Sequence, residues 1–209
     1  MTDADTLAYY ATTVRERPWP TVLDAMARFD REGRGEPRPR LAVDLGCGAG
    51  RDTRALLARG WRVLAIDREK AGIAALRKAT PRSDRVRLQT LVGDLATARL
   101  PRCDLVVADL SLTFVTGEAW CRAWAHLKAA LRPGARFAGM FLCDRDEAAD
   151  DPQMTCPPPR AIRRLLAGLR IERWSDREEE GFTAAGEPHH VHLVEVVARR
   201  PRPRPLRRG

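Results

Sequence analysis

The 209-residue chain is long enough for one sizeable hydrophobic core and hardly long enough for two. No uninterrupted apolar stretch approaches the roughly 20 residues that span a bilayer, and residues 1–5 lack the layout of a secretory signal. We therefore expect a cytoplasmic protein with no membrane partner. Its five cysteines are odd in number and contain no C-x-x-C pair, which argues against both a disulfide framework and a zinc site.

The formal net charge of +9 is concentrated near the end of the chain. Six arginines lie between Arg199 and Arg208, so residues 1–198 are only mildly basic, with a formal charge of +3. Residues 199–209 alternate proline with arginine, a composition that buries nothing and predicts a disordered tail. Two interpretations stay open for it: contact with the phosphates of RNA or with another acidic surface, or a solvated terminus without a partner.

Residues 1–40 are predicted to form a helical lid and a linker. Apolar residues at helical spacing predict a helix over residues 21–30, with Thr21 as its N-terminal cap. Glycine and proline are frequent in residues 33–40, which indicates a linker. The globular domain is then expected to occupy residues 41–198.

Within this domain, short apolar runs alternate with helical stretches. Several runs are apolar at consecutive positions, which is typical of strands that are covered on both faces. The alternation predicts an α/β fold with a Rossmann-like, doubly wound sheet and helices on both faces. The expected strands are 41–45, 62–66, 86–92, 105–108 and 135–142, and the expected helices are 52–59, 69–79, 117–131 and 160–169. Residues 170–174 and 190–198 form two further strands joined by an irregular loop, with the last strand antiparallel.

A glycine-rich turn follows the first strand and indicates a cofactor site. It reads Asp44-Leu45-Gly46-Cys47-Gly48-Ala49-Gly50, and its glycines allow the backbone to pass close to a ligand. The dinucleotide pattern G-x-G-x-x-G requires its third glycine at Arg51, one residue after Gly50. The spacing therefore favours a nucleoside cofactor other than NAD.

Aspartates stand at the carboxyl ends of four successive strands, where open α/β sheets bind ligands. Asp67 follows the glycine turn by about 20 residues, an offset at which a carboxylate accepts both ribose hydroxyls. Asp94 is placed to accept a hydrogen bond from an adenine amino group. With Asp44 and Asp109, these residues form an acidic rim that suits a cationic sulfonium better than a pyrophosphate.

These residues resemble the class I S-adenosylmethionine-dependent methyltransferases over roughly residues 41–199, most closely the small-molecule, tellurite-resistance-type branch. The resemblance is carried by the segment V-D-L-G-C-G-A-G-R-D-T, the strand-end aspartates, and the turn Leu131-Arg132-Pro133-Gly134-Ala135. It implies a seven-stranded sheet with the last strand antiparallel. It also implies a site for S-adenosylmethionine, whose first part is the turn with Asp44, Gly46, Cys47, Gly48 and Gly50. In this site Asp67 and Arg68 lie at the ribose, and Asp94 and Leu95 lie at the adenine. Asp109 and Leu110 lie beside the methyl group.

The acceptor is less well defined by the sequence. Candidate substrate residues are Tyr9 and Tyr10 in the lid, Phe114 after the fourth strand, and Asp144 and Arg145 after the fifth. Arg145, His190 and His192 are candidates for catalysis, and two histidines alone are too few for a metal site. We expect methyl transfer to an oxygen, nitrogen or sulfur of a small molecule. The alternatives are an RNA or protein methyltransferase that uses the basic tail and, less favoured, an NAD-dependent oxidoreductase.

Overall fold

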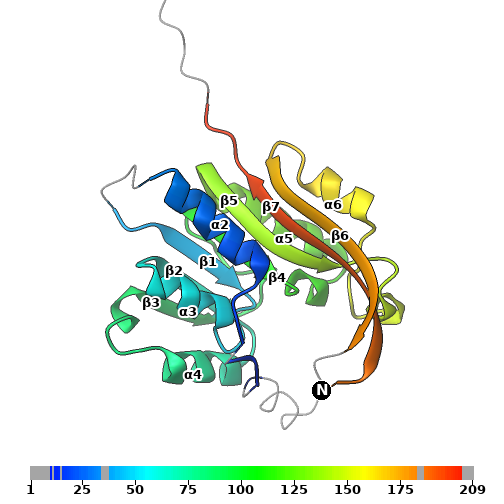
Figure 1. The fold of residues 1–209 in the computed structure, drawn as a ribbon, viewed down its shortest axis with the longest axis horizontal. Coiled ribbons are helices and arrows are strands. Elements are labelled where there is room, and N and C mark those ends of the chain that lie inside the picture. Colours follow the sequence, from blue (N-terminus) through cyan, green and yellow to red (C-terminus); the bar gives the residue numbers. More distant parts are fainter. Residues whose placement is uncertain (1–9, 11, 15, 34–37, 183–185, 204–209) are drawn as a thin grey trace, which may run out of the picture.

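The computed structural model of the chain describes residues 10, 12–14, 16–33, 38–182 and 186–203. Its core is a seven-stranded sheet in the order β3-β2-β1-β4-β5-β7-β6 (Figure 1). The strands are β1 (Leu41–Leu45), β2 (Arg62–Asp67), β3 (Leu88–Val92), β4 (Cys103–Asp109), β5 (Leu131–Leu142), β6 (Arg170–Phe182) and β7 (Pro188–Arg199). The first five strands pair in parallel, and β7 is antiparallel to both β5 and β6. The predicted doubly wound fold is confirmed.

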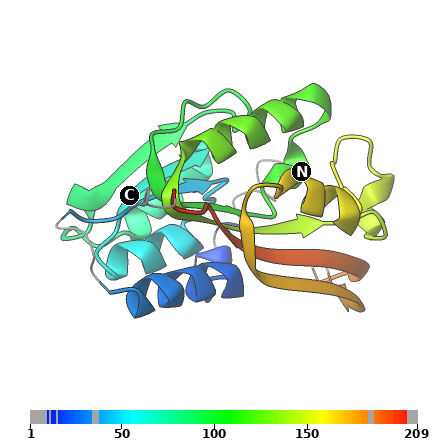
Figure 2. The same cartoon turned by 90° about the horizontal axis from the view of Figure 1, so that it is seen from above.

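Helices cover both faces of this sheet (Figure 2). On one face lie α2 (Pro20–Arg31), α3 (Arg51–Ala58) and α4 (Lys70–Ala79), whose apolar side chains share a core with β1, β2 and β4. On the other face α5 (Gly117–Ala130) and α6 (Pro159–Leu165) pack over β4, β5 and β7. Short 3-10 turns complete the chain: η1 (Arg85–Arg87), η2 (Leu112–Phe114) and η3 (Glu147–Asp150). None of the helices in the described residues is long and apolar enough to cross a membrane.

The last two strands are much longer than the sequence predicted. An irregular loop was expected between residues 174 and 190, whereas β6 continues to Phe182 and β7 begins at Pro188. The two strands pair from Arg170 with Arg199 to Phe182 with Pro188. The polar residues of this extension hid its strand character, because the hairpin projects beyond the core and its side chains are largely exposed.

Helix α2 begins one residue earlier than expected, and Thr21 is not its cap. The N-terminal cap position is Trp19, and Pro20 occupies the first turn, where its missing N–H costs nothing. The Thr21 hydroxyl instead donates a hydrogen bond to Asp109 Oδ1 at 2.8 Å. This bond attaches the start of α2 to the carboxyl end of β4.

The ordered chain extends further than the predicted boundary of the tail. Arg199 is the last residue of β7 and pairs with Arg136 of β5. Arg200 donates through its side chain to the carbonyl oxygen of Leu131 at 2.7 Å, and its backbone N–H bonds to Ala135 O. The prediction of disorder from residue 199 is therefore wrong at its first two residues, while residues 204–209 lie outside the described part of the chain.

Candidate cofactor site

The glycine turn joins β1 to α3 in a backbone conformation that suits glycine. Gly46 and Gly48 have φ angles of 71° and 50°, in the left-handed region that side chains with a Cβ avoid. The amides of Gly46 and Cys47 both donate to Ile66 O in β2, which fixes the turn against the sheet. A Cβ on Gly46 would lie 2.3 Å from Ser111 Cβ, so the turn also packs closely against the loop after β4.

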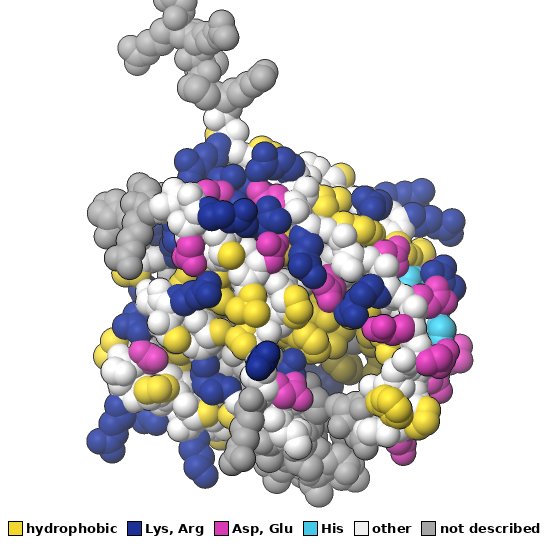
Figure 3. Space-filling view, viewed as in Figure 1, with side chains coloured by type: hydrophobic (Ala, Val, Ile, Leu, Met, Phe, Trp, Pro, Cys, Tyr) yellow, Lys and Arg dark blue, Asp and Glu magenta, His cyan; other side chains and the backbone are white. Residues whose placement is uncertain are grey.

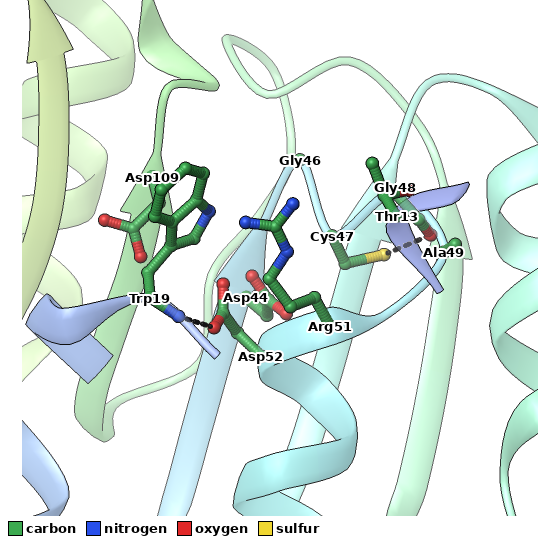
Figure 4. A pocket seen from close by; sticks show the side chains of 10 residues that line it. All are labelled: Thr13, Trp19, Asp44, Gly46, Cys47, Gly48, Ala49, Arg51, Asp52 and Asp109. Atoms are coloured by element: carbon green, nitrogen blue, oxygen red, sulfur yellow. Dashed lines mark hydrogen bonds between the residues drawn. The ribbon is translucent and has the colours of Figure 1, made fainter. Parts of the chain in front are cut away.

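A pocket opens directly over this turn (Figure 4). Five of the residues predicted from the sequence line it: Asp44, Gly46, Cys47, Gly48 and Asp109. Five others complete the lining, namely Thr13, Trp19, Ala49, Arg51 and Asp52. Ala49 lies within the predicted glycine turn and Trp19 within the predicted lid, whereas the sequence interpretation had assigned no cofactor contact to Thr13, Arg51 or Asp52. The acidic Asp52 in the first turn of α3 was the signal that could have identified one of them.

Three buried aspartates lie around the pocket. Asp44 accepts a hydrogen bond from the Thr53 hydroxyl at 2.5 Å, and Asp52 accepts one from the backbone N–H of Trp19 at 2.9 Å. Burial raises the pKa of Asp44 to about 7, assisted by the negative charge of Asp52, and burial raises the pKa of Asp52 to about 6. Burial, together with the charge of Asp52, also raises the pKa of Asp109 well above its ordinary value. A cation in the pocket would relieve this repulsion.

Asp109 has a carboxylate oxygen without a hydrogen-bond partner in the described residues. Its Oδ1 accepts from Thr21, whereas its buried Oδ2 has no hydrogen-bond partner in the described residues. A buried carboxylate oxygen without a donor is costly and calls for an explanation. The next residue, Leu110, has a φ of 56°, the only positive φ among the described non-glycine residues. Backbone strain of this kind concentrates at ligand sites.

Asp67 closes the turn from the end of β2. Its Oδ2 accepts from the Gly48 amide at 2.7 Å, and its Oδ1 accepts from the Glu69 amide at 2.9 Å. A carboxylate has about four acceptor positions, so two remain for the hydroxyls of a ribose. Beside it, the guanidinium of Arg68 lies 5.6 Å from the ring centre of the half-exposed Phe114, which places these two predicted residues together.

The other predicted cofactor residues occupy supporting positions around the turn. Gly50 caps the start of α3 with a φ of 83°, and a Cβ there would meet Leu76. Asp94 accepts a hydrogen bond from the Ala96 amide at 2.6 Å in the loop after β3, and Leu95 packs against the core on the α5 side. None of the three lines the pocket over the glycine turn. Their roles in binding remain predictions.

Described residues of the N-terminal segment lie near the glycine turn, and their role as a lid stays a prediction. The ring of the buried Tyr10 would be 3.4 Å from a Cβ on Gly48 and 3.0 Å from one on Gly72, so it packs on both. Arg51 stacks its guanidinium 4.3 Å from the Trp19 ring centre and forms an ion pair with Glu16. Tyr9 lies outside the described residues.

The histidine and arginine candidates meet in a different place. His192 is fully buried, and its Nδ1 accepts from the Arg145 amide at 3.2 Å while its Nε2 lies 3.1 Å from Asp176. His190 contacts Glu180 and Glu178, and the hydrogen bond with Glu180 raises its pKa. Arg145 pairs with Glu178 at 2.6 Å, and Asp144 lies 3.5 Å from His192. These contacts bind the hairpin to the loop after β5, and both nitrogens of His192 are occupied.

The strand register separates these histidines from Asp109. Asp109 pairs with Met140, Met140 with Glu195, and Glu195 with Ser175, so these four side chains form a row on one face of the sheet. Side chains alternate along β7, which puts His190 and His192 on the opposite face. The described residues contain no group of three metal-ligating side chains placed to hold an ion.

The row contains an anchored arginine that sequence reasoning missed. The buried Glu195 accepts from Arg173 at 2.5 Å and from Arg177 at 3.0 Å. Arg173 keeps part of its side chain exposed, while its buried Nε has no hydrogen-bond partner in the described residues. Arg177 makes a second ion pair with the exposed Glu179. The sequence predicted strands at residues 170–174 and 190–198, which contain Arg173 and Glu195, but gave no sign that their side chains pair, and it placed Arg177 in a loop.

The sheet order, the glycine turn and the strand-end aspartates define the fold and site of the class I S-adenosylmethionine-dependent methyltransferases. Residues 42–134 match a family model described as a methyltransferase domain. The chain therefore matches a methyltransferase domain over these residues and has the fold of that class.

Individual relatives agree with this placement. A trans-aconitate 2-methyltransferase of Acidovorax ebreus (strain TPSY) is 35% identical over 168 residues, which are 79% of this chain and 60% of the relative. The chain thus spans about three fifths of that relative's length. The crystal structure of TehB from Haemophilus influenzae superposes with a TM-score of 0.71 at 17% identity, over 86% of this chain and 61% of the other. A Burkholderia thailandensis 1,6-didemethyltoxoflavin-N1-methyltransferase with bound S-adenosylhomocysteine gives a TM-score of 0.63 at 21% identity, over 90% and 78%.

Proposed function

We propose that the protein transfers a methyl group from S-adenosylmethionine to a carboxylate oxygen of a small acceptor. The observation that carries the proposal is the row Asp109–Met140–Glu195, which has an unpaired acceptor oxygen at one end and an anchored arginine beside the other. S-adenosylmethionine supplies an electrophilic methyl group on a sulfonium. All other roles in the reaction belong to residues of the chain.

The pocket residues fit this cofactor. Gly48 has a positive φ and no side chain between its backbone and a ligand, and Asp67 keeps two acceptor positions for ribose hydroxyls. The buried Oδ2 of Asp109 is an acceptor for the α-ammonium group. The joint negative potential of Asp44, Asp52 and Asp109 favours a ligand that carries positive charge, and it disfavours a pyrophosphate.

The acceptor end of the row favours an anion. Glu195 holds Arg173 on the face that bears Asp109, and the unpaired Nε of Arg173 is a donor for a carboxylate. Adjacent strands lie about 4.8 Å apart, so Glu195 on β7 is about 10 Å from Asp109 on β4 across β5. That distance is suited to a small molecule that spans from the arginine to the methyl group. The curated relative is named for trans-aconitate, an anion with three carboxylates.

A carboxylate acceptor also fits the protonation chemistry of the site. Its oxygen is already anionic at neutral pH, so attack on the methyl group requires no general base. The chain's task is then to position the acceptor and exclude water, for which Trp19 and Tyr10 in the N-terminal segment are suitably placed. This removes the need for His190 or His192 to act in catalysis.

The proposal is tested by measuring release of S-adenosylhomocysteine with a panel of small di- and tricarboxylic acids and their amide analogues. We expect turnover with at least one acid and none with its amide. Arg173→Gln should raise KM for that acid about tenfold or more, with the affinity for S-adenosylhomocysteine unchanged. Arg163→Gln is the matched control, because Arg163 stacks on Trp174 away from this face. Turnover of amine or thiol acceptors alone, unaffected by Arg173→Gln, would refute the carboxylate assignment.

A further inference from the structure

Arginines mark the edge of the sheet that lies opposite the candidate site. Each of the seven strands carries an arginine within one residue of its end on that side. We call this set the arginine edge, and its members are Arg40, Arg62, Arg87, Arg102, Arg132, Arg170 and Arg199. Strands β1 to β6 all run in one direction, which places six of the arginines together, and the antiparallel β7 adds Arg199 because it ends where the others begin.

The strand order turns these arginines into a continuous row. Neighbouring strands are about 4.8 Å apart, so seven strands spread the row over roughly 29 Å. In Figure 3 many Lys and Arg side chains gather at the upper end of the molecule, where β7 leads into the C-terminal segment. In the sequence, further arginines follow at 202, 204, 207 and 208.

The row keeps an excess of positive charge. Asp104 is shared by Arg38 and Arg132, and Glu172 pairs with Arg170 as well as with the buried Arg136. The exposed Arg62 and Arg102 form no ion pair with any residue in the described ranges. Arg87 also pairs with Asp84, and Arg199 pairs with Glu32. The arginines of the row still outnumber these paired carboxylates, and the charges of Arg62 and Arg102 are not compensated by an ion pair in the described residues.

From this arrangement we propose that the arginine edge binds the phosphate backbone of a single-stranded nucleic acid. A narrow line of charge about 29 Å long matches a linear polyanion, and guanidinium groups donate paired hydrogen bonds to phosphate oxygens. Binding to a membrane surface would also require large exposed apolar side chains. Most exposed ones in the described residues, including Leu91, Phe114 and Phe182, lie toward the opposite edge.

The nucleic acid bound here is not the methyl acceptor. Strand β4 separates Arg102 from Asp109 by the length of seven residues, about 20 Å of extended chain. A phosphate contacted at Arg62 or Arg102 is therefore far from the pocket. The proposal is independent of the methyl-transfer proposal, because it concerns binding at a surface the pocket does not share.

The test is fluorescence anisotropy of a labelled 20-nucleotide oligouridylate with the full chain at several salt concentrations. We expect binding that weakens steeply with salt, since each neutralised phosphate of a single strand contributes about −0.7 to the slope of log K against log salt. The double variant Arg62→Glu/Arg102→Glu should lower the affinity about tenfold or more at low salt and reduce the slope by about 1 to 1.5.

The matched control reverses the charge of two exposed arginines that lie away from the arginine edge. Arg122→Glu/Arg160→Glu changes the net charge by the same amount on α5 and α6, nearer the other edge. Binding that falls equally in both double variants would overturn the proposal, because it would depend on net charge alone. Equal or tighter binding of polyglutamate, or of vesicles rich in anionic lipid, would also overturn it. Retained S-adenosylhomocysteine affinity in the variants shows that they are folded.

Discussion

The two edges of the sheet carry opposite charges and perform different tasks. The carboxyl edge presents Asp44, Asp52 and Asp109 around a pocket in which burial raises their pKa values and favours their neutral forms. The amino edge presents exposed arginines such as Arg62 and Arg102. The two edges differ in the burial of their charges. A buried charge requires a group of opposite charge beside it, whereas an exposed charge acts over a distance and is screened by salt.

The largest effect is expected from Gly48→Val at the carboxyl edge. A β-branched side chain would fill the approach to the turn and resist its positive φ, so binding of S-adenosylhomocysteine should fall below detection in calorimetry. Gly60→Val is the matched control, because Gly60 has a φ of 83° with no neighbouring atom within 4 Å of an added Cβ. It should lose stability and keep binding. Full affinity in a folded Gly48→Val protein would remove the turn from the site.

The next largest effect is expected from Asp67→Ala. Loss of charge-assisted hydrogen bonds to a ribose should weaken binding by about 1 to 3 kcal/mol, or roughly 5- to 150-fold. Asp84→Ala provides the comparison at the other edge, where Asp84 pairs with Arg87 at 2.6 Å. Titration should show no change in cofactor affinity for that variant, and equal losses in the two would indicate a general effect of removing a carboxylate.

The buried aspartates predict opposite pH trends for stability and binding. Their folded pKa values, about 7 for Asp44 and about 6 for Asp52, lie above the ordinary 3.8, so ionisation opposes folding. The free energy of unfolding of the ligand-free protein should therefore fall as pH rises from about 4 through 7. Affinity for S-adenosylmethionine should rise over the same upper range, because the ionised carboxylates attract its positive charge.

Thermal unfolding and calorimetry between pH 5.5 and 8 would measure both trends. Asp52→Asn should flatten the two curves, because the charge of Asp52 contributes to the raised pKa values of Asp44 and Asp109. If the free energy of unfolding and the cofactor affinity rise or fall together with pH in the unmodified protein, the assignment of the buried aspartates to cation binding would be contradicted.

The smallest effect is expected from removing residues 204–209. The described residues that form the pocket and the row from Asp109 to Glu195 all precede residue 196, so turnover of a small acceptor should change less than twofold. The cut lies beyond Arg199 and Arg200, which belong to the fold. A large loss of turnover on small acceptors would instead link the tail to the acceptor site and weaken the division between the two edges.

The sequence was sufficient where local pattern decides structure. The runs that end in Asp44, Asp67 and Asp109 are buried strands with ligand-facing ends, and they lie where apolar runs and glycine spacing predicted them. The sheet order and the antiparallel last strand followed from the resemblance of these residues to a known class.

The sequence was insufficient where tertiary contacts decide the structure. Polar residues after Trp174 resemble a loop, yet pairing with β7 makes them a strand, and this strand brings Arg177 to Glu195. Thr21 has the chemistry of a helix cap, but its hydroxyl is captured by Asp109 across the fold. The position of His192 depends on the same hairpin, whose register no local pattern specifies.

The most direct measurement of the central claim is a pair of calorimetric titrations of the full chain, one with S-adenosylhomocysteine and one with NAD. The acidic pocket and the spacing that places Arg51 where a dinucleotide site requires glycine predict micromolar binding of the first and no heat from the second. Binding of NAD without binding of S-adenosylhomocysteine would contradict the account of the carboxyl edge.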